Sequence, residues 1–160
     1  MEQSNQNTEE LQEASNALYY EISMLKYSAR GLASDITGES TIHNSLVESF
    51  LIHARLLIEF LYKDKRYKDN VMAADFFSTP EKWRKIRPEK SKLLNETFEG
   101  SHKLLAHLSY TRLQVKKTWP YLEIAKEIEA VLNVLLQNVS EDLLGSRWKT
   151  SSEEQKKDRQ

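Results

Sequence analysis

The sequence predicts an all-α protein, a bundle of four to five helices with a long decorated connection between the second and third core helices. Three observations support this prediction. The 160 residues include only four glycines and three prolines, so residues that interrupt helices are scarce. Apolar residues recur at steps of three and four over several long stretches, which is the spacing of one helix face. No stretch sustains the alternation of a half-buried strand.

The first predicted helix runs from about residue 8 to residue 30, where Gly31 is expected to end it. The second is the centre of the bundle. Ser45 and Glu48 have the spacing of a capping box and are expected to start it.

This central stretch, residues 46–62, reads LVESFLIHARLLIEFLY and is the most apolar run of the chain. At ~100° per residue, one continuous apolar face is about 140° wide. Its members are Leu46, Val47, Phe50, Leu51, Ala54, Leu57, Ile58 and Leu61, and a second apolar strip consists of Ile52, Leu56 and Phe60. A helix that is apolar on nearly every side is normally covered by other helices.

Residues 63–90 are expected to form the long connection, because Pro80 and Pro88 oppose a continuous helix. Its apolar piece VMAADFF should fold back onto the bundle. One short helical turn is expected to begin at Ser78 or Thr79, where the following proline suits a first-turn position.

The third core helix is expected to resume near Ser91 and either to bend or to restart at the glycine-serine pair 100–101. The last helix should open at Pro120, continue to about Leu143 and stop at Gly145. Residues 1–149 are thus predicted to form a single domain, and the charged residues 150–160 a disordered tail.

The composition excludes several classes of function. The chain has no cysteine, which removes disulfides, cysteine-containing zinc sites and thiol nucleophiles. Its first residues lack the pattern of a signal peptide, and no apolar run approaches the ~20 residues of a membrane span. We therefore expect a cytoplasmic protein without a membrane partner.

The net charge of −1 is unevenly distributed. Residues 63–92 contain ten basic and five acidic residues, interleaved with aromatics. Such a mixture suits a phosphate backbone and unstacked bases, although the same residues also suit a solvated loop whose aromatics pack on the bundle. The candidate nucleic-acid-binding residues are Lys63, Lys65, Arg66, Lys68, Lys82, Arg84, Lys85 and Arg87.

The histidines give no metal site. His102 and His107 stand five residues apart, so on a regular helix they are separated by about 140° and do not face one ion. The chain also lacks a glycine-rich phosphate loop and a nucleophile elbow. We expect neither a metal nor another cofactor.

The central helix carries charges that an exposed ion pair does not explain. Arg55 and Glu59 stand four apart in the weaker order, which is worth only ~0.3 kcal/mol when exposed. Either they face solvent, or they join a polar seam with the segment AHLSYTR of the third helix. The candidate members of this seam are Glu48, His53, Glu59 and Tyr110. The plain interpretation of His53 is a hydrogen-bonded core histidine.

Four segments, ALYYEISML, LVESFLIHARLLIEFLY, VMAADFF and AHLSYTR, resemble a group of bacterial helical proteins that are in turn similar to the HEPN superfamily. The resemblance covers about residues 17–135. Members of that superfamily include dimeric metal-independent ribonucleases that carry an arginine, then four to six intervening residues, then a histidine. Members without this motif are binding or assembly modules. The resemblance places His107 at the catalytic histidine, but no arginine precedes it at that spacing.

Three hypotheses follow, and the missing arginine favours the first. It is a non-catalytic HEPN-like bundle that acts through protein association, as a homodimer or with a partner from a neighbouring gene, in a bacterial defence or toxin-antitoxin setting. The second is a divergent ribonuclease that uses His107 with Arg112, Arg55 or His102. The third is RNA binding by residues 63–92 without cleavage.

Overall fold

The structure is a computed structural model that describes residues 8–34, 40–64, 69–106, 110 and 118–149. Throughout these ranges the chain forms helices and turns and contains no strand, which confirms the all-α prediction. The α-helices are α1 (Thr8–Ala33), α2 (Ser40–Tyr62), α3 (Pro80–Ile86), α4 (Lys92–Ala106) and α6 (Tyr121–Asn138). Two 3₁₀ turns are η1 (Ala73–Phe76) and η2 (Glu141–Leu143).

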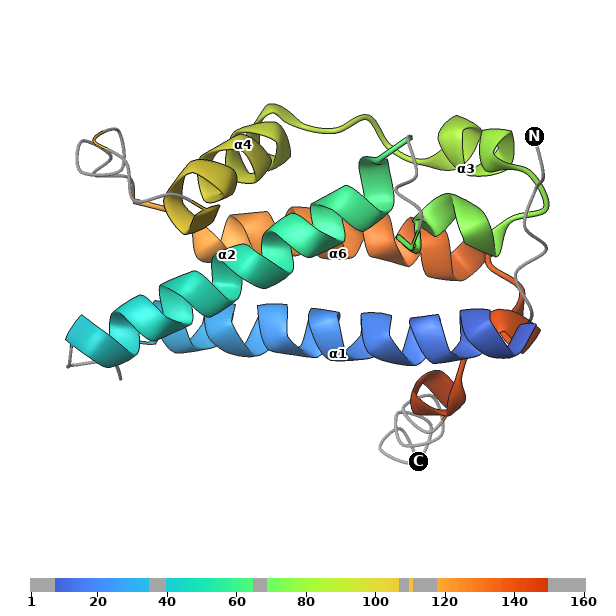
Figure 1. Cartoon of the computed structure of the whole chain (residues 1–160), viewed down its shortest axis with the longest axis horizontal. Helices are drawn as coiled ribbons and strands as arrows, with labels where there is room; N and C mark the ends of the chain where they lie inside the picture. Colours follow the sequence, from blue (N-terminus) through green and yellow to red (C-terminus); the bar gives the residue numbers. More distant parts are fainter. Residues whose placement is uncertain (1–7, 35–39, 65–68, 107–109, 111–117, 150–160) are drawn as a thin grey trace, which may run out of the picture.

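Four long helices make the bundle (Figure 1). Helices α1 and α6 run side by side, α2 crosses both, and α4 packs against α2 and α6. The connection between α2 and α4 carries η1 and α3, which contact each other near the end of α2. This is the predicted bundle with a decorated crossover. None of the described helices is both long and apolar enough to cross a bilayer.

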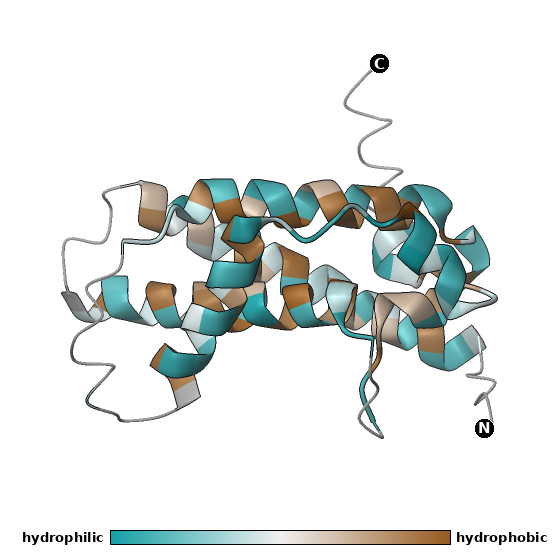
Figure 2. Cartoon of the chain, turned by 90° about the horizontal axis from the view of Figure 1, so that it is seen from above, coloured by the Kyte–Doolittle hydropathy of each residue, from teal (hydrophilic) through white to brown (hydrophobic). Residues whose placement is uncertain are grey.

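The predicted apolar face of α2 is the centre of the core. Phe50, Leu51, Ala54, Leu57, Ile58 and Leu61 are each at most 1% exposed. Figure 2 shows the same division on the other helices, where brown apolar residues alternate with teal polar ones. The residues of the second apolar strip of α2 differ in burial: Phe60 is buried against Phe76, whereas Ile52 and Leu56 are exposed.

The connection folds back as predicted. Ala73 and Phe76 of η1 are buried in the main core, and Trp83 of α3 is 1% exposed. Helix α3 begins at Pro80 with Thr79 as its N-cap, as the proline predicted.

The predicted boundary between α1 and α2 was wrong. Helix α1 continues through Gly31 to Ala33, where a Cβ on the glycine would lie only 3.0 Å from Leu46 of α2. The glycine therefore allows close helix packing instead of ending the helix. Helix α2 starts at Ser40, and the hydroxyl of Ser45 donates to the Thr41 carbonyl within the helix rather than capping it.

Helix α4 continues through the glycine-serine pair without a restart. The hydroxyl of Ser101 is buried and donates to the carbonyl of Phe98 at 2.9 Å. Gly100 faces the ring of Trp119, which a Cβ would approach to 2.7 Å. Gly100 is thus explained by packing against the chain that leads into α6, and Ser101 by a hydrogen bond within α4.

The last helix ends earlier than predicted, at Asn138 instead of Leu143, because Val139 and the following residue adopt extended backbone. This lets the chain return to α1. The amide of Gly145 donates to the hydroxyl of Ser15 at 2.7 Å, and the indole nitrogen of Trp148 donates to the Ser15 carbonyl at 2.8 Å.

Candidate functional site

The described part of the molecule has a pocket of about 540 Å³ between α1 and α2. In Figure 1 the C-terminal half of α2 diverges from the N-terminal half of α1. The residues that line the pocket come from these two halves and from residues 69–71. Its walls combine apolar and acidic side chains, among them Leu56, Phe60, Val71, Glu21, Glu59 and Asp69. We call this the α1/α2 pocket.

Glu21, which lines the α1/α2 pocket, makes a polar contact with His53 that joins α1 to α2. The Nδ1 atom of His53 lies 2.5 Å from Oε2 of Glu21, and the two side chains are 12% and 19% exposed. The ring of Tyr20 packs edge-on against the His53 ring, with centroids 6.0 Å apart. His53 is thus a half-buried, hydrogen-bonded histidine that holds α2 against α1.

The acidic groups of the opposite wall lie near the end of α2. Glu59 accepts hydrogen bonds from the ammonium group of Lys63 and from the amide of Asn70. Asp69 stands beside Asn70 on the chain and is exposed. Of these two carboxylates, Asp69 is exposed, whereas Glu59 is already paired with Lys63.

Large apolar side chains remain exposed around the α1/α2 pocket. Ile52 and Leu56 are 49% and 43% exposed and stand four residues apart on α2. Tyr20 is 48% exposed and Val71 is 37% exposed. We call the pocket together with these four residues the α1/α2 face.

A second polar contact joins α2 to α4. The Nη1 atom of Arg55 lies 2.6 Å from Nδ1 of His102, and the guanidinium of Arg55 lies 5.3 Å from the centre of the Phe98 ring. Because arginine only donates hydrogen bonds, Nδ1 of His102 is the acceptor in this contact. Two of the four candidate catalytic residues are thus brought together. The other two, His107 and Arg112, lie outside the described residues.

The residues of the predicted polar seam have partners in different directions. His53 faces α1 and Arg55 faces α4, because residues two apart on a helix point about 200° apart. Glu59 binds Lys63, and Glu48 is exposed. Tyr110 is 87% exposed.

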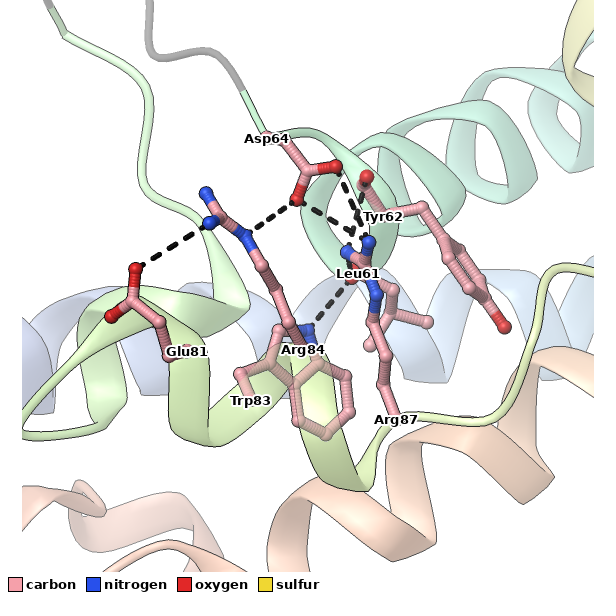
Figure 3. A network of polar contacts seen from close by, with 7 residues as sticks. All are labelled: Leu61, Tyr62, Asp64, Glu81, Trp83, Arg84 and Arg87. Atoms are coloured by element: carbon pink, nitrogen blue, oxygen red, sulfur yellow. Dashed lines mark hydrogen bonds and ion pairs between the residues drawn. The ribbon is translucent and has the colours of Figure 1, made fainter.

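Several described residues of the basic connection make contacts within the molecule, and Figure 3 shows those around the end of α2. The indole nitrogen of Trp83 donates to the Leu61 carbonyl at 2.8 Å, and Arg87 donates to the carbonyls of Leu61 and Tyr62 at 3.4 and 3.2 Å. These donors satisfy carbonyls at the end of α2 that have no partner within the helix. Arg87 also contacts the carboxylate of Asp64.

The candidate nucleic-acid-binding residues therefore divide into three groups. Lys63, Arg84 and Arg87 form ion pairs with Glu59 or Asp64. Lys82 and Lys85 are exposed on α3. The remaining candidates, Lys65, Arg66 and Lys68, lie outside the described residues.

Tyr62 lies beside this network with a buried phenol oxygen that has no hydrogen-bond partner in the described structure. Burial raises the pKa of this phenol, the charge of Arg87 lowers it, and the charge of Glu127 raises it further, so that the net direction is upward. Burial also raises the pKa of Tyr121.

Sequence reasoning missed Glu21 and Asp69. Glu21 lies next to Ile22 and three residues after Leu18, two buried residues, so it borders the apolar face of α1 as His53 borders that of α2. That position could have suggested a contact between the helices. Within the described ranges, no group of three histidine and acidic side chains lies close enough to hold a metal ion.

Comparison of the chain with models of protein families, with curated proteins and with solved structures finds no match. A functional proposal therefore has to rest on the residues of this chain.

Proposed function

We propose that this chain is a HEPN-like helical bundle that acts through protein association, with the α1/α2 face as its docking surface. The observation that carries the proposal is the group of large apolar side chains left exposed around the α1/α2 pocket. Apolar patches rimmed by polar groups on a soluble fold are typical of interaction sites.

The energetic argument rests on Ile52 and Leu56. Fully burying an exposed side chain of this kind contributes about 1.5 to 3 kcal/mol, and these two, already about half buried, can gain about half of that each. The two stand on one stripe of the central helix. Tyr20 adds an aromatic side chain that is already positioned by the His53 ring. Aromatic anchors of this type are frequent at the energetic centre of interfaces.

The occupant we propose is a different protein and not a second copy. A symmetric contact through the α1/α2 face would bring two sets of Glu21, Glu59 and Asp69 into one interface. Glu21 and Glu59 already contact His53 and Lys63, which offsets part of their charge. Asp69 and the exposed Glu10 and Glu13 of α1 would still enter the interface twice, and these like charges would oppose the contact.

A photo-crosslinking amino acid at position 52, introduced into the protein in its native host, tests this proposal. We expect a covalent adduct of one defined mass that disappears in the Leu56→Asp variant and persists in Leu122→Asp. Leu122 is a matched control because it is 55% exposed on α6. An adduct with a second copy of the chain, or one that survives Leu56→Asp, would contradict the proposal.

The contact between Arg55 and His102 favours one second candidate, a divergent HEPN-type ribonuclease. A histidine beside a guanidinium places a candidate general base next to a group that binds phosphate. Incubation of the purified protein with total RNA, beside Arg55→Ala, His102→Ala and His107→Ala, separates the two candidates. Cleavage that any of these variants abolishes would make the chain an enzyme, whereas intact RNA favours the association module.

A further inference from the structure

We infer that the partner segment at the α1/α2 face is a basic amphipathic helix, whose apolar side packs on Ile52 and Leu56. Its Lys or Arg side chains reach the acidic groups of the rim, where Asp69 is exposed and Glu21 and Glu59 already contact His53 and Lys63. This inference rests on the proposed function and names the chemistry of the partner. It is carried by the charge, shape and secondary structure of the α1/α2 face.

The charge of the α1/α2 face extends beyond the pocket along α1. Glu10 and Glu13 are exposed and stand four residues before Ala14 and Ala17, so they share the stripe of α1 that lines the pocket. From Thr8 to Leu25, α1 has no lysine or arginine. A partner that lies along this stripe meets only acidic charged groups on α1, which favours basic side chains.

The shape of the α1/α2 pocket suits inserted side chains. Ala14 and Ala17 are small, so α1 leaves room opposite Leu56 and Val71. A volume of about 540 Å³ holds several side chains but not a helix, which is about 10 to 12 Å wide. The backbone of the partner must then lie above the pocket, with apolar anchors three and four residues apart pointing in.

The secondary structure of the α1/α2 face offers no sheet edge to which an extended peptide could add a strand. Extended peptides bind by adding a strand to an exposed sheet edge. The described residues contain no strand, and both walls of the pocket are helical apart from residues 69–71. Long basic side chains of a docked helix lay their carbon stems on Leu56 and still place their charges at the carboxylates of the rim.

The test uses the full chain and a fluorescein-labelled helical peptide of leucine and lysine, arranged with leucine on one face. A matched peptide carries glutamate in place of lysine. We expect fluorescence anisotropy to show binding of the lysine peptide and not of the glutamate peptide. Its Kd should rise about tenfold between 50 and 300 mM salt, because the contacts between charged groups are screened.

Variants then locate the binding. Glu59→Gln and Asp69→Asn should each raise the Kd of the lysine peptide about threefold to fivefold. Leu56→Asp should raise it more than tenfold. Glu123→Gln is the matched control, because Glu123 is exposed on α6, and it should leave the Kd unchanged.

Two results separate this inference from the proposed function. If Leu56→Asp abolishes the crosslink at position 52 but the lysine peptide binds no better than the glutamate peptide, the docking face stands and the basic partner is wrong. The basic partner is also wrong if Glu123→Gln weakens binding of the lysine peptide as much as Asp69→Asn does. If Leu56→Asp changes neither the crosslink nor the Kd, both proposals are wrong.

Discussion

Glu21 of α1 and His53 of α2 meet with 2.5 Å between Oε2 and Nδ1, and Glu21 lines the α1/α2 pocket. Removing either partner leaves the other polar group in a mostly buried position without its hydrogen bond. We expect Glu21→Gln or His53→Ala to lower the free energy of unfolding by about 1 to 2 kcal/mol at neutral pH. Urea denaturation measures this change.

The pair between Lys26 and Glu129 is the control for that prediction. It joins α1 to α6 at 3.0 Å but is 40% and 35% exposed. We expect Lys26→Ala to cost less than about 1 kcal/mol, because exposed ion pairs contribute little. Equal losses in the two pairs would show that the pocket wall has no special role in stability.

Trp83 should stabilise the end of α2 through its indole nitrogen as well as its ring. The Trp83→Phe variant keeps an aromatic ring but leaves the Leu61 carbonyl without its 2.8 Å donor. We expect a loss of about 1 to 3 kcal/mol and faster amide hydrogen exchange in the last turn of α2. Arg84→Ala should change exchange there much less, because the Arg84 side chain is 44% exposed and contacts only side chains. Unchanged exchange in Trp83→Phe would refute this role.

Stability should fall at alkaline pH partly because of Tyr62. Burial raises the pKa of its phenol above the usual 10.0, so above that pH the unfolded chain loses its proton first and unfolding is favoured. Below pH 10 both states are protonated and the phenol gives no pH dependence. We expect Tyr62→Phe to unfold in urea with a shallower loss of stability above pH 10 than the wild type. Parallel curves of unfolding free energy against pH for the two proteins would contradict this prediction. In Tyr62→Phe, the raised pKa of Tyr121 accounts for the loss of stability at alkaline pH that remains.

Gly100 should tolerate alanine poorly although it lies inside a helix. Alanine would gain about 1 kcal/mol of helix propensity, but its Cβ would stand 2.7 Å from Cη2 of the buried Trp119 ring. We expect Gly100→Ala to destabilise the protein by about 1 to 3 kcal/mol in thermal or urea unfolding. Gly31→Ala is the comparison, because its Cβ would meet the end of the flexible Leu46 side chain at 3.0 Å, and it should cost less.

Apolar spacing predicted the helical class, the core face of α2 and the inward packing of VMAADFF, because each depends on residues close together in the chain. The boundaries failed where a distant residue decides the structure. A glycine at position 31 predicts the end of a helix, yet here it makes room for Leu46. The last helix stops at Asn138 so that Gly145 reaches Ser15.

The candidate site was less predictable for the same reason. The sequence marked His53 and Arg55 as polar residues in an apolar helix but not their partners, Glu21 and His102. Predicting those partners requires the packing angles of α1 and α4 against α2, and the spacing of residues along one helix does not give these angles.

The contacts of Ser15 and Tyr19 with Trp148 also set an order of assembly during translation. The Tyr19 and Trp148 rings pack edge to face with centroids 5.1 Å apart, and the indole donates to the Ser15 carbonyl. On the ribosome, α1 emerges before the other helices of the bundle, but this side of it remains open until more than a hundred further residues have been synthesised. Helix α1 thus gains its last contacts only after α6 has been made, and a nascent chain stalled before Trp148 exposes Tyr19 to chaperones and proteases.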